Sequence, residues 1–131
     1  MDVAAGEAID LGCWTLTEES VRSYLDAVGD DLTLYLELGV APPLALCAYA
    51  LGAMLEKLSL PVGAIHSIQE MEAVGAASIG QDIYGEAVPE RPRKRGGLRF
   101  MTVGYTLRDD AGQVVQTGKT TVLTPESGDQ G

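Results

Sequence analysis

Apolar and polar residues alternate most regularly between residues 98 and 107. The apolar positions are Met101, Val103, Tyr105 and Leu107, and the positions between them are Thr102, Gly104 and Thr106. Because successive side chains of a strand point to opposite faces of its sheet, this pattern predicts a half-buried strand. The turn-forming sequence 109–112, Asp-Asp-Ala-Gly, follows it and predicts a hairpin to the next strand.

Further strands and two helices follow from the same kind of pattern. Strands are predicted over 64–74, 81–88 and 113–124, with a short edge strand over 8–14 and loops over 30–43 and 89–97. In the first predicted helix, which Thr17 can cap and Gly29 can end, the apolar face consists of Val21, Tyr24, Leu25 and Val28.

The second predicted helix, 44–58, has no charged residue before Glu56. It is therefore apolar all round for about three turns, which is typical of a helix surrounded by other structure. Gly52 lies in its middle, where glycine costs roughly 1 kcal/mol relative to alanine. We expect the close approach of a strand to compensate for this cost.

One hydrophobic helix across a long antiparallel sheet is an α+β arrangement. We expect a single domain over residues 1–131, with an ordered core over about 8–124 and a disordered tail over 125–131. The open sheet edges predict pairing with a second copy. The uncharged run 38–55 contains Pro42 and Pro43, so it is not expected to cross a membrane.

Composition narrows the function. The net charge of −10 argues against a nucleic-acid partner. Cys13 and Cys47 have no paired or metal-binding spacing, and the N-terminus lacks a secretory pattern, so a reduced cytoplasmic setting is expected. With one histidine and no clustered ligands, no metal site is expected.

Several motifs together resemble the MaoC-like acyl-thioester hydratase/dehydratase family. Residues 64–74, which contain His-Ser-Ile-Gln-Glu, and the following Gly-Gln-Asp-Ile of 80–83 are similar to the family's strand pair. Residues 96–103, 110–115 and 118–122 are similar to its closing hairpin. The helix 18–28 before Gly29-Asp30, and Ala41-Pro42-Pro43 before the apolar helix, occur in the family's order. The resemblance covers roughly residues 15–124 and implies a hotdog fold, in which a curved antiparallel sheet wraps a long helix.

The resemblance also implies a missing catalytic group. Catalytic members carry Gly-Asp-x-Asn-Pro-Ile/Leu-His, whose Asp and His move protons and water at the 2,3 positions of an acyl thioester. Here the segment reads Gly29-Asp30-Asp31-Leu32-Thr33-Leu34-Tyr35, so Asp30 matches the aspartate while Tyr35 replaces the histidine. A phenol with an ordinary pKa near 10 is a poor general base at neutral pH. Alternatively, Asp30 caps a turn and Tyr35 only packs against the first helix.

By resemblance, the chain is a subunit for (R)-3-hydroxyacyl or enoyl thioesters of coenzyme A or a carrier protein, without a further cofactor. It would form a homodimer, or a heterodimer with a chain that bears the Asp and His. Pro42 and Pro43, beside the apolar helix, would contact the substrate. The basic loop residues Arg93, Lys94 and Arg95 would hold a phosphate or an acidic carrier protein, or simply offset neighbouring carboxylates as a solvated loop.

Two other functions stay open. A stand-alone thioesterase or lyase could use Glu56, although that residue also marks the point where the helix reaches solvent, or His66, the only histidine. His66 could form an acid/base pair with Asp30 or Glu70, or have a structural role at the start of its strand. The last alternative is a non-enzymatic acyl-binding or scaffolding protein whose tunnel is filled by side chains.

Overall fold

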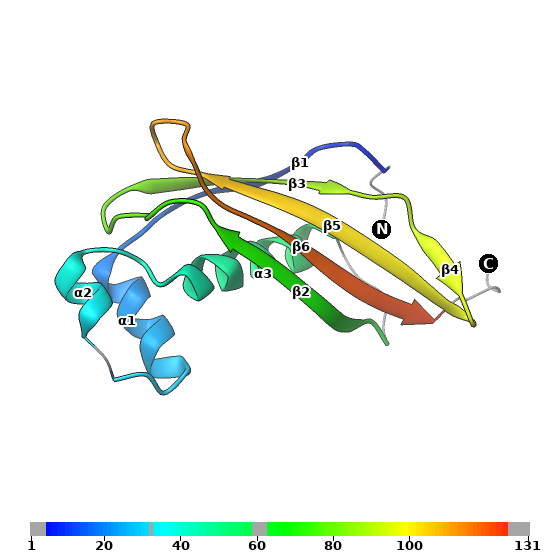
Figure 1. Cartoon of the computed structure of the whole chain (residues 1–131), viewed down its shortest axis with the longest axis horizontal. Helices are drawn as coiled ribbons and strands as arrows, with labels where there is room; N and C mark the ends of the chain where they lie inside the picture. The colour runs from blue at the N-terminus through cyan, green and yellow to red at the C-terminus, as the bar shows by residue number, and fades with distance from the viewer. Residues whose placement is uncertain (1–4, 32, 59–62, 126–131) are drawn as a thin grey trace.

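Six strands form one antiparallel sheet, and the longest helix lies against one of its faces (Figure 1). The structure is a computed structural model that describes residues 5–31, 33–58 and 63–125. The strand order is β1-β3-β5-β6-β2, and β4 pairs with β5 beyond the end of β3. The strands are β1 Ile9–Thr15, β2 Ile65–Ala73, β3 Asp82–Pro89, β4 Arg93–Arg95, β5 Leu98–Arg108 and β6 Val114–Pro125; the helices are α1 Glu18–Ala27, α2 Leu34–Leu38 and α3 Pro43–Leu58. The predicted α+β arrangement is confirmed.

Strand β5 is the clearest success of the hydrophobic pattern. Its apolar positions are buried in the core between the sheet and α3, and the residues between them face the other side. The predicted hairpin also forms. Oδ1 of Asp109 accepts hydrogen bonds from the backbone amides of Ala111 and Gln113, and each donor–acceptor distance is 3.0 Å. Strand β6 follows directly and pairs with β5 along nearly its whole length.

Local signals define both long helices. Thr17 accepts the amide of Ser20 at 3.0 Å and Ser20 accepts the amide of Thr17 at 3.1 Å, which is a capping box at the start of α1. Helix α3 begins at Pro43, a position where proline's missing N–H is not needed. The side of α3 that the sheet covers consists of Ala45, Leu46, Cys47, Ala50, Met54 and Leu58.

The opposite side of α3 is open in the single chain. Leu44 is 60% exposed and Leu55 is 45% exposed. The predicted close approach of a strand to Gly52 is wrong: within the described residues, nothing beyond the helix's own backbone and chain neighbours lies within 4 Å of where a Cβ would stand. The sheet curves over one side of the helix only, and Gly52 is on the other side.

Two segments predicted as loops contain regular structure. Within 30–43, α2 ends at Gly39, whose φ of 68° is left-handed. Within 89–97, β4 returns to β5 through Gly96 and Gly97, both at positive φ, which is the geometry of a tight hairpin. Both elements are short, at 5 and 3 residues, so hydrophobic periodicity could not reveal them.

The ends of the chain complete the picture. Of the segment predicted as a disordered tail, Pro125 is the last residue of β6, and 126–131 lie outside the described residues. Among the described helices, none has the length and apolar character needed to span a bilayer.

Candidate functional site

Three tyrosines from three helices gather in one region below the sheet, which we call the tyrosine corner. Tyr24 on α1, Tyr35 on α2 and Tyr49 on α3 are half-buried and pack against the hydrophobic core. The Tyr49 hydroxyl donates to the backbone oxygen of Ser20 over 3.2 Å, which joins α3 to α1. The ring of Trp14 on β1 meets the Tyr49 ring edge to face, with 6.3 Å between the centroids.

Backbone hydrogen bonds hold Asp30 and Tyr35 in place at the tyrosine corner. Directly after α1, the backbone amide of Asp30 donates a hydrogen bond of 2.9 Å to the backbone oxygen of Leu25. The oxygen of Tyr35 accepts from the amide of Val40 over 3.0 Å, which closes α2. Val40 in turn forms an isolated bridge with Ser78, so the segment that carries Tyr35 is tied to the connection between β2 and β3.

Asp30 and Tyr35 both lie near enough to Tyr24 to affect its pKa. Burial raises the pKa of Tyr24, and smaller contributions come from Cys47, Tyr35, Tyr49 and Asp30. The phenol of Tyr24 therefore stays protonated at neutral pH and is a hydrogen-bond donor. Tyr35, Tyr49 and Asp30 add two further hydroxyls and a carboxyl group to this region.

Pro42 and Pro43 lie at the inner end of the same region. Pro42 is buried, and the backbone oxygen of Pro43 accepts a hydrogen bond over 2.9 Å from Nε2 of Gln116, which is fully buried on β6. Oε1 of Gln116 accepts the Tyr105 hydroxyl over 2.7 Å. Burial, and next a hydrogen bond with Cys47, raises the pKa of Tyr105. This buried chain of polar groups fixes the start of α3 on the sheet.

His66 lies elsewhere. It is exposed on β2, where its Nε2 is 3.0 Å from Oε1 of Gln69, and Gln69 also accepts the hydroxyl of Thr120 over 2.8 Å. The strand register places His66 and Gln69 on one face and Glu70 on the other, so the anticipated pair of His66 with Glu70 does not form. Figure 1 shows the start of β2 far from α1 and α2, and so His66 is not brought to Asp30.

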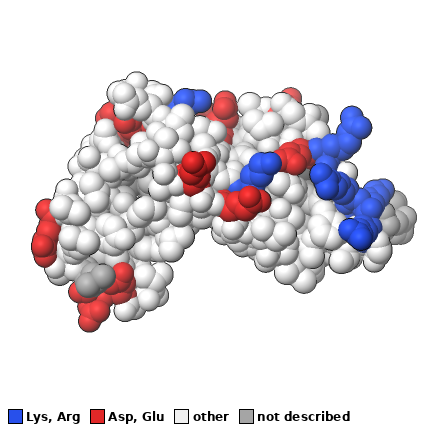
Figure 2. Space-filling model, in the orientation of Figure 1, with Lys and Arg blue, Asp and Glu red and all other residues white. Residues whose placement is uncertain are grey.

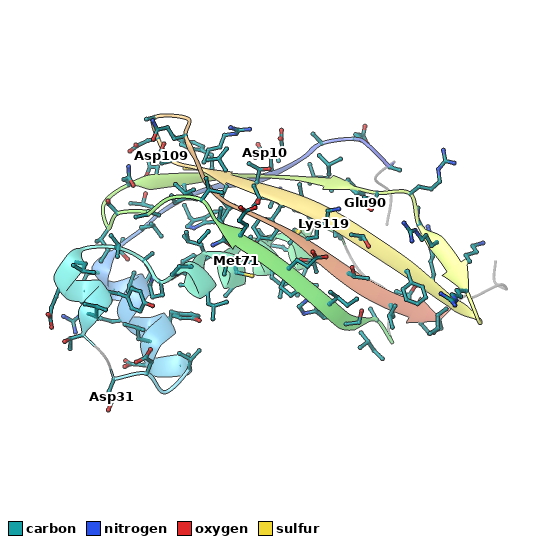
Figure 3. All side chains as sticks on the ribbon, viewed as in Figure 1. Asp10, Asp31, Met71, Glu90, Asp109 and Lys119 are labelled. Carbon is teal, nitrogen blue, oxygen red and sulfur yellow. The ribbon has the colours of Figure 1, made fainter. Side chains whose placement is uncertain are left out.

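The cations Arg93, Lys94 and Arg95 form β4, and all three are exposed. Together with neighbouring residues they border a groove of about 410 Å³. Figure 2 shows that most of the Lys and Arg side chains visible on this face lie at one end of the molecule. In Figure 3 the labelled Asp31, the neighbour of Asp30, lies at the opposite end. Within one chain the cations and the tyrosine corner are therefore not in contact.

Glu56 is exposed at the rim of a second, shallow groove of about 490 Å³. Trp14, Tyr49 and Gly52 also line this groove. Within the part of the chain that the structure describes, Glu56 forms no ion pair or hydrogen bond with another ionisable group. Also within those residues, His, Cys, Asp and Glu side chains form no group of three that could hold a metal ion.

The sequence patterns did not single out Gln116, Tyr24 or Tyr49 as parts of a site. Gln116 offered no sequence signal, because a polar residue beside Val115 in a strand is ordinarily one that faces solvent. The three tyrosines are spread over 24–49 in the sequence, and only the packing of three helices brings them together.

Comparisons with known proteins agree on the fold. A monoamine oxidase regulatory protein from Archaeoglobus aligns with a TM-score of 0.82 and 16% identity, covering 95% of this chain and 92% of that one. The HadBC (3R)-hydroxyacyl-ACP dehydratase complex of Mycobacterium tuberculosis gives 0.77 and 18%, covering 92% and 96%. A MaoC-like dehydratase from Rhodospirillum rubrum gives 0.74 and 16%, covering 95% and 94%.

Further structural matches include two (R)-hydratases. No family model and no curated protein matches the sequence. The structural neighbours are thus MaoC-like dehydratases and (R)-hydratases, and the chain has their hotdog fold.

Proposed function

We propose that this chain is a MaoC-like acyl-thioester hydratase/dehydratase subunit that binds (R)-3-hydroxyacyl or enoyl thioesters and depends on a second hotdog chain for the Asp/His pair. The observation that carries the proposal is Tyr35. It stands where the resemblance calls for the histidine, in a chain whose fold is shared with dehydratases. Backbone hydrogen bonds anchor the segment around Tyr35, which lies near Asp30 at the tyrosine corner.

The chemistry of hydration explains why this replacement matters. Adding water to an enoyl thioester needs a group that accepts a proton from water near neutral pH. An imidazole with a pKa near 6.5 can do this, whereas a phenol with a pKa near 10 cannot without a large downward shift. Burial raises the pKa of the neighbouring Tyr24, so its phenol stays protonated. That phenol can donate a hydrogen bond that binds and orients a carbonyl group.

Strand β2 offers the surface for a second chain. It pairs with β6 on one side only, and its apolar residues Ile65 and Ile68 are 61% and 51% exposed. The open side of α3, with Leu44 and Leu55, adds apolar surface that an assembly would cover. An unpaired strand edge with exposed apolar residues favours pairing with another strand.

A twofold pairing across β2 would also complete the substrate site. Two antiparallel copies of β2 would bring the β4 end of one chain toward the helix end of its partner. A thioester could then run from the cations of β4, which suit phosphate groups, toward Pro42, Pro43 and Tyr35 of the other chain. This arrangement accounts for the separation of the two groups within one chain.

The test measures hydration of a trans-2-enoyl-CoA by three preparations. The pure chain alone is expected to show no turnover. Tyr35→His is expected to give measurable turnover, because it restores an imidazole beside Asp30. Addition of a hotdog chain with the Asp and His to the unaltered protein is expected to give turnover that depends on both chains.

The control is Tyr35→Phe, which removes the hydroxyl and adds no base. It should stay inactive alone and should still support activity with the partner chain. Robust hydration by the unaltered chain alone would overturn the subunit proposal. Release of free thiol from an acyl-CoA, abolished in Glu56→Gln, would instead identify a thioesterase.

A further inference from the structure

The groove that contains Glu56 at its rim lies between α3, α1 and β1, and its volume is about 490 Å³. The residues that border it are Trp14 and Thr15 from β1, Ser20 from α1, and Ala48, Tyr49, Gly52, Ala53 and Glu56 from α3. Ala48 and Glu56 are eight positions apart in the sequence. Because a helix rises 1.5 Å per residue, the groove extends about 12 Å along α3.

Small residues of α3 make the groove hollow. Ala48 and Gly52 are exposed, and Ala53 is half-buried. Within the described residues, a Cβ at Gly52 would meet no atom within 4 Å other than those of its own helix backbone and its chain neighbours. The floor of the groove is therefore apolar and has room for a ligand.

Two aromatic side chains border this hollow. The rings of Trp14 and Tyr49 are inclined at 80° to each other, with 6.3 Å between their centroids, and both side chains are partly exposed. Nε1 of Trp14 is buried and has no hydrogen-bond partner in the part of the chain that the structure describes, so packing of its ring positions the indole. The faces of indole and phenol rings are electron-rich and attract cations, the indole most strongly.

The polar groups around the groove differ in whether the protein already uses them. The hydroxyl of Thr15 donates a hydrogen bond to Asp82, and the hydroxyl of Tyr49 donates one to the backbone oxygen of Ser20. Glu56 is exposed, and its carboxylate has no ion pair or hydrogen bond among the described residues. The groove therefore offers a ligand one negative charge beside aromatic rings, and hydroxyls whose protons are already donated.

From this combination we infer that the groove binds a small molecule that carries a quaternary ammonium group. Such a group has a positive charge and no N–H donor, whereas a primary ammonium has three donors that each need an acceptor. The charge would lie between the aromatic rings and Glu56, and the methyl groups would contact Ala48 and Gly52. The net charge of −10 also attracts a cationic ligand to the protein.

The groove adjoins the proposed thioester site, because Tyr49 belongs to both the groove and the tyrosine corner. Its charge is nevertheless of the opposite sign to that of β4, since the only charged side chain among the described residues that border it is Glu56. Binding of a cation is measured directly and needs no thioester turnover. Absence of hydration would therefore leave this inference standing, and absence of cation binding would leave the thioester proposal standing.

The experiment titrates the full chain with choline and follows the fluorescence of Trp14, which is the only tryptophan in the sequence. Saturable binding with a change in indole emission is expected, and isothermal titration calorimetry measures the Kd independently. The matched control ligand is the neutral analogue of choline, in which carbon replaces the nitrogen. It keeps the shape and loses the charge, so it should bind about tenfold more weakly.

Two variants locate the site. Glu56→Gln removes the charge and keeps the side-chain size, so choline should bind about threefold more weakly, the scale expected of an exposed ion pair. Glu86→Gln is the matched control, because it removes the same charge from β3, outside the groove, and should leave the Kd unchanged. Gly52→Leu fills the hollow with a good helix former, so it should abolish binding and keep the melting temperature of the unaltered chain.

Four results would overturn the inference. The first is absence of choline binding to the unaltered chain. The second is equal affinity for choline and its neutral analogue, which would indicate hydrophobic contact alone. The third is equal weakening in Glu56→Gln and Glu86→Gln, which would indicate only general attraction to an acidic protein. The last is binding of a trimethyllysine peptide without binding of choline, which would identify a protein-docking surface instead.

Discussion

The hydroxyl of Tyr105 on β5 donates a hydrogen bond of 2.7 Å to the side chain of Gln116 on β6, 11 positions further along the chain. Gln116 is fully buried and passes the connection on to the backbone of Pro43 at the start of α3. This pair therefore joins the two central strands to the helix they support. Both side chains are buried, so this hydrogen bond lies within the apolar core.

Gln116→Leu should lower the free energy of unfolding by roughly 2 kcal/mol or more, because each buried polar group left without a partner costs about 1–3 kcal/mol. Urea unfolding measures it. Tyr105→Phe alone should cost less, and the double variant should cost less than the sum of the two single changes. Gln113→Leu, at an exposed hairpin position, is the control, and an equal effect there would contradict the assignment.

Gly118→Ala should destabilise the protein by about 1–3 kcal/mol or more, the usual cost of overpacking. A Cβ at this position would overlap the ring of Tyr105 and lie 2.6 Å from the backbone oxygen of Glu70, which cannot rotate away. Gly104→Ala is the matched control on the neighbouring strand, where the nearest atom would be 3.8 Å away. Equal melting temperatures for the two variants would show that the Tyr105 ring is placed differently.

Gly52→Ala should raise the free energy of unfolding by about 0.5–1 kcal/mol, because alanine favours a helix interior and the position has open space around it. Chemical denaturation together with sedimentation measures stability and assembly in the same samples. Gly29→Ala should have the opposite effect, since Gly29 has a φ of 73° that a Cβ strains. Loss of both stability and association in Gly52→Ala would mean that a partner chain packs closely on α3.

Stability should fall with alkaline pH through Tyr105. Its pKa in the folded chain is raised, first by burial, whereas a tyrosine in an unfolded chain ionises near pH 10. The stabilising contribution is therefore complete below about pH 10 and is lost as pH rises toward the folded-state pKa, by up to about 1.4 kcal/mol per pH unit.

Urea midpoints between pH 8 and 11.5 for the unaltered protein and Tyr105→Phe provide the comparison, in which the variant should show a shallower decline. Tyr35→Phe is the control, since Tyr35 is only half-buried and lies outside the Tyr105–Gln116 pair. Parallel pH curves for the unaltered protein and Tyr105→Phe would show that the Tyr105 phenol is not protected by the fold.

Much of the fold could be predicted from the sequence because its signals are local. The alternation of β5 depends on the two-residue period of a strand, and the capping of α1 by Thr17 depends on residues three apart. The motifs that resemble MaoC-like domains led to the hotdog arrangement, which the structural neighbours share. Short elements such as α2 and β4 escaped because they span too few residues to show a period.

The candidate site was harder to predict, because it is formed by residues that are close in space but far apart in the sequence. The sequence alone determined that Tyr35 stands where an imidazole would be needed, and that the cations are concentrated in one segment. Only the tertiary structure decided that Tyr35 joins Tyr24 and Tyr49, that His66 lies on an edge strand away from them, and that the groove beside β4 faces away from α3. The physical reason is that residue type and local period fix chemistry and secondary structure, whereas the strand order and the curvature of the sheet determine which chemical groups meet.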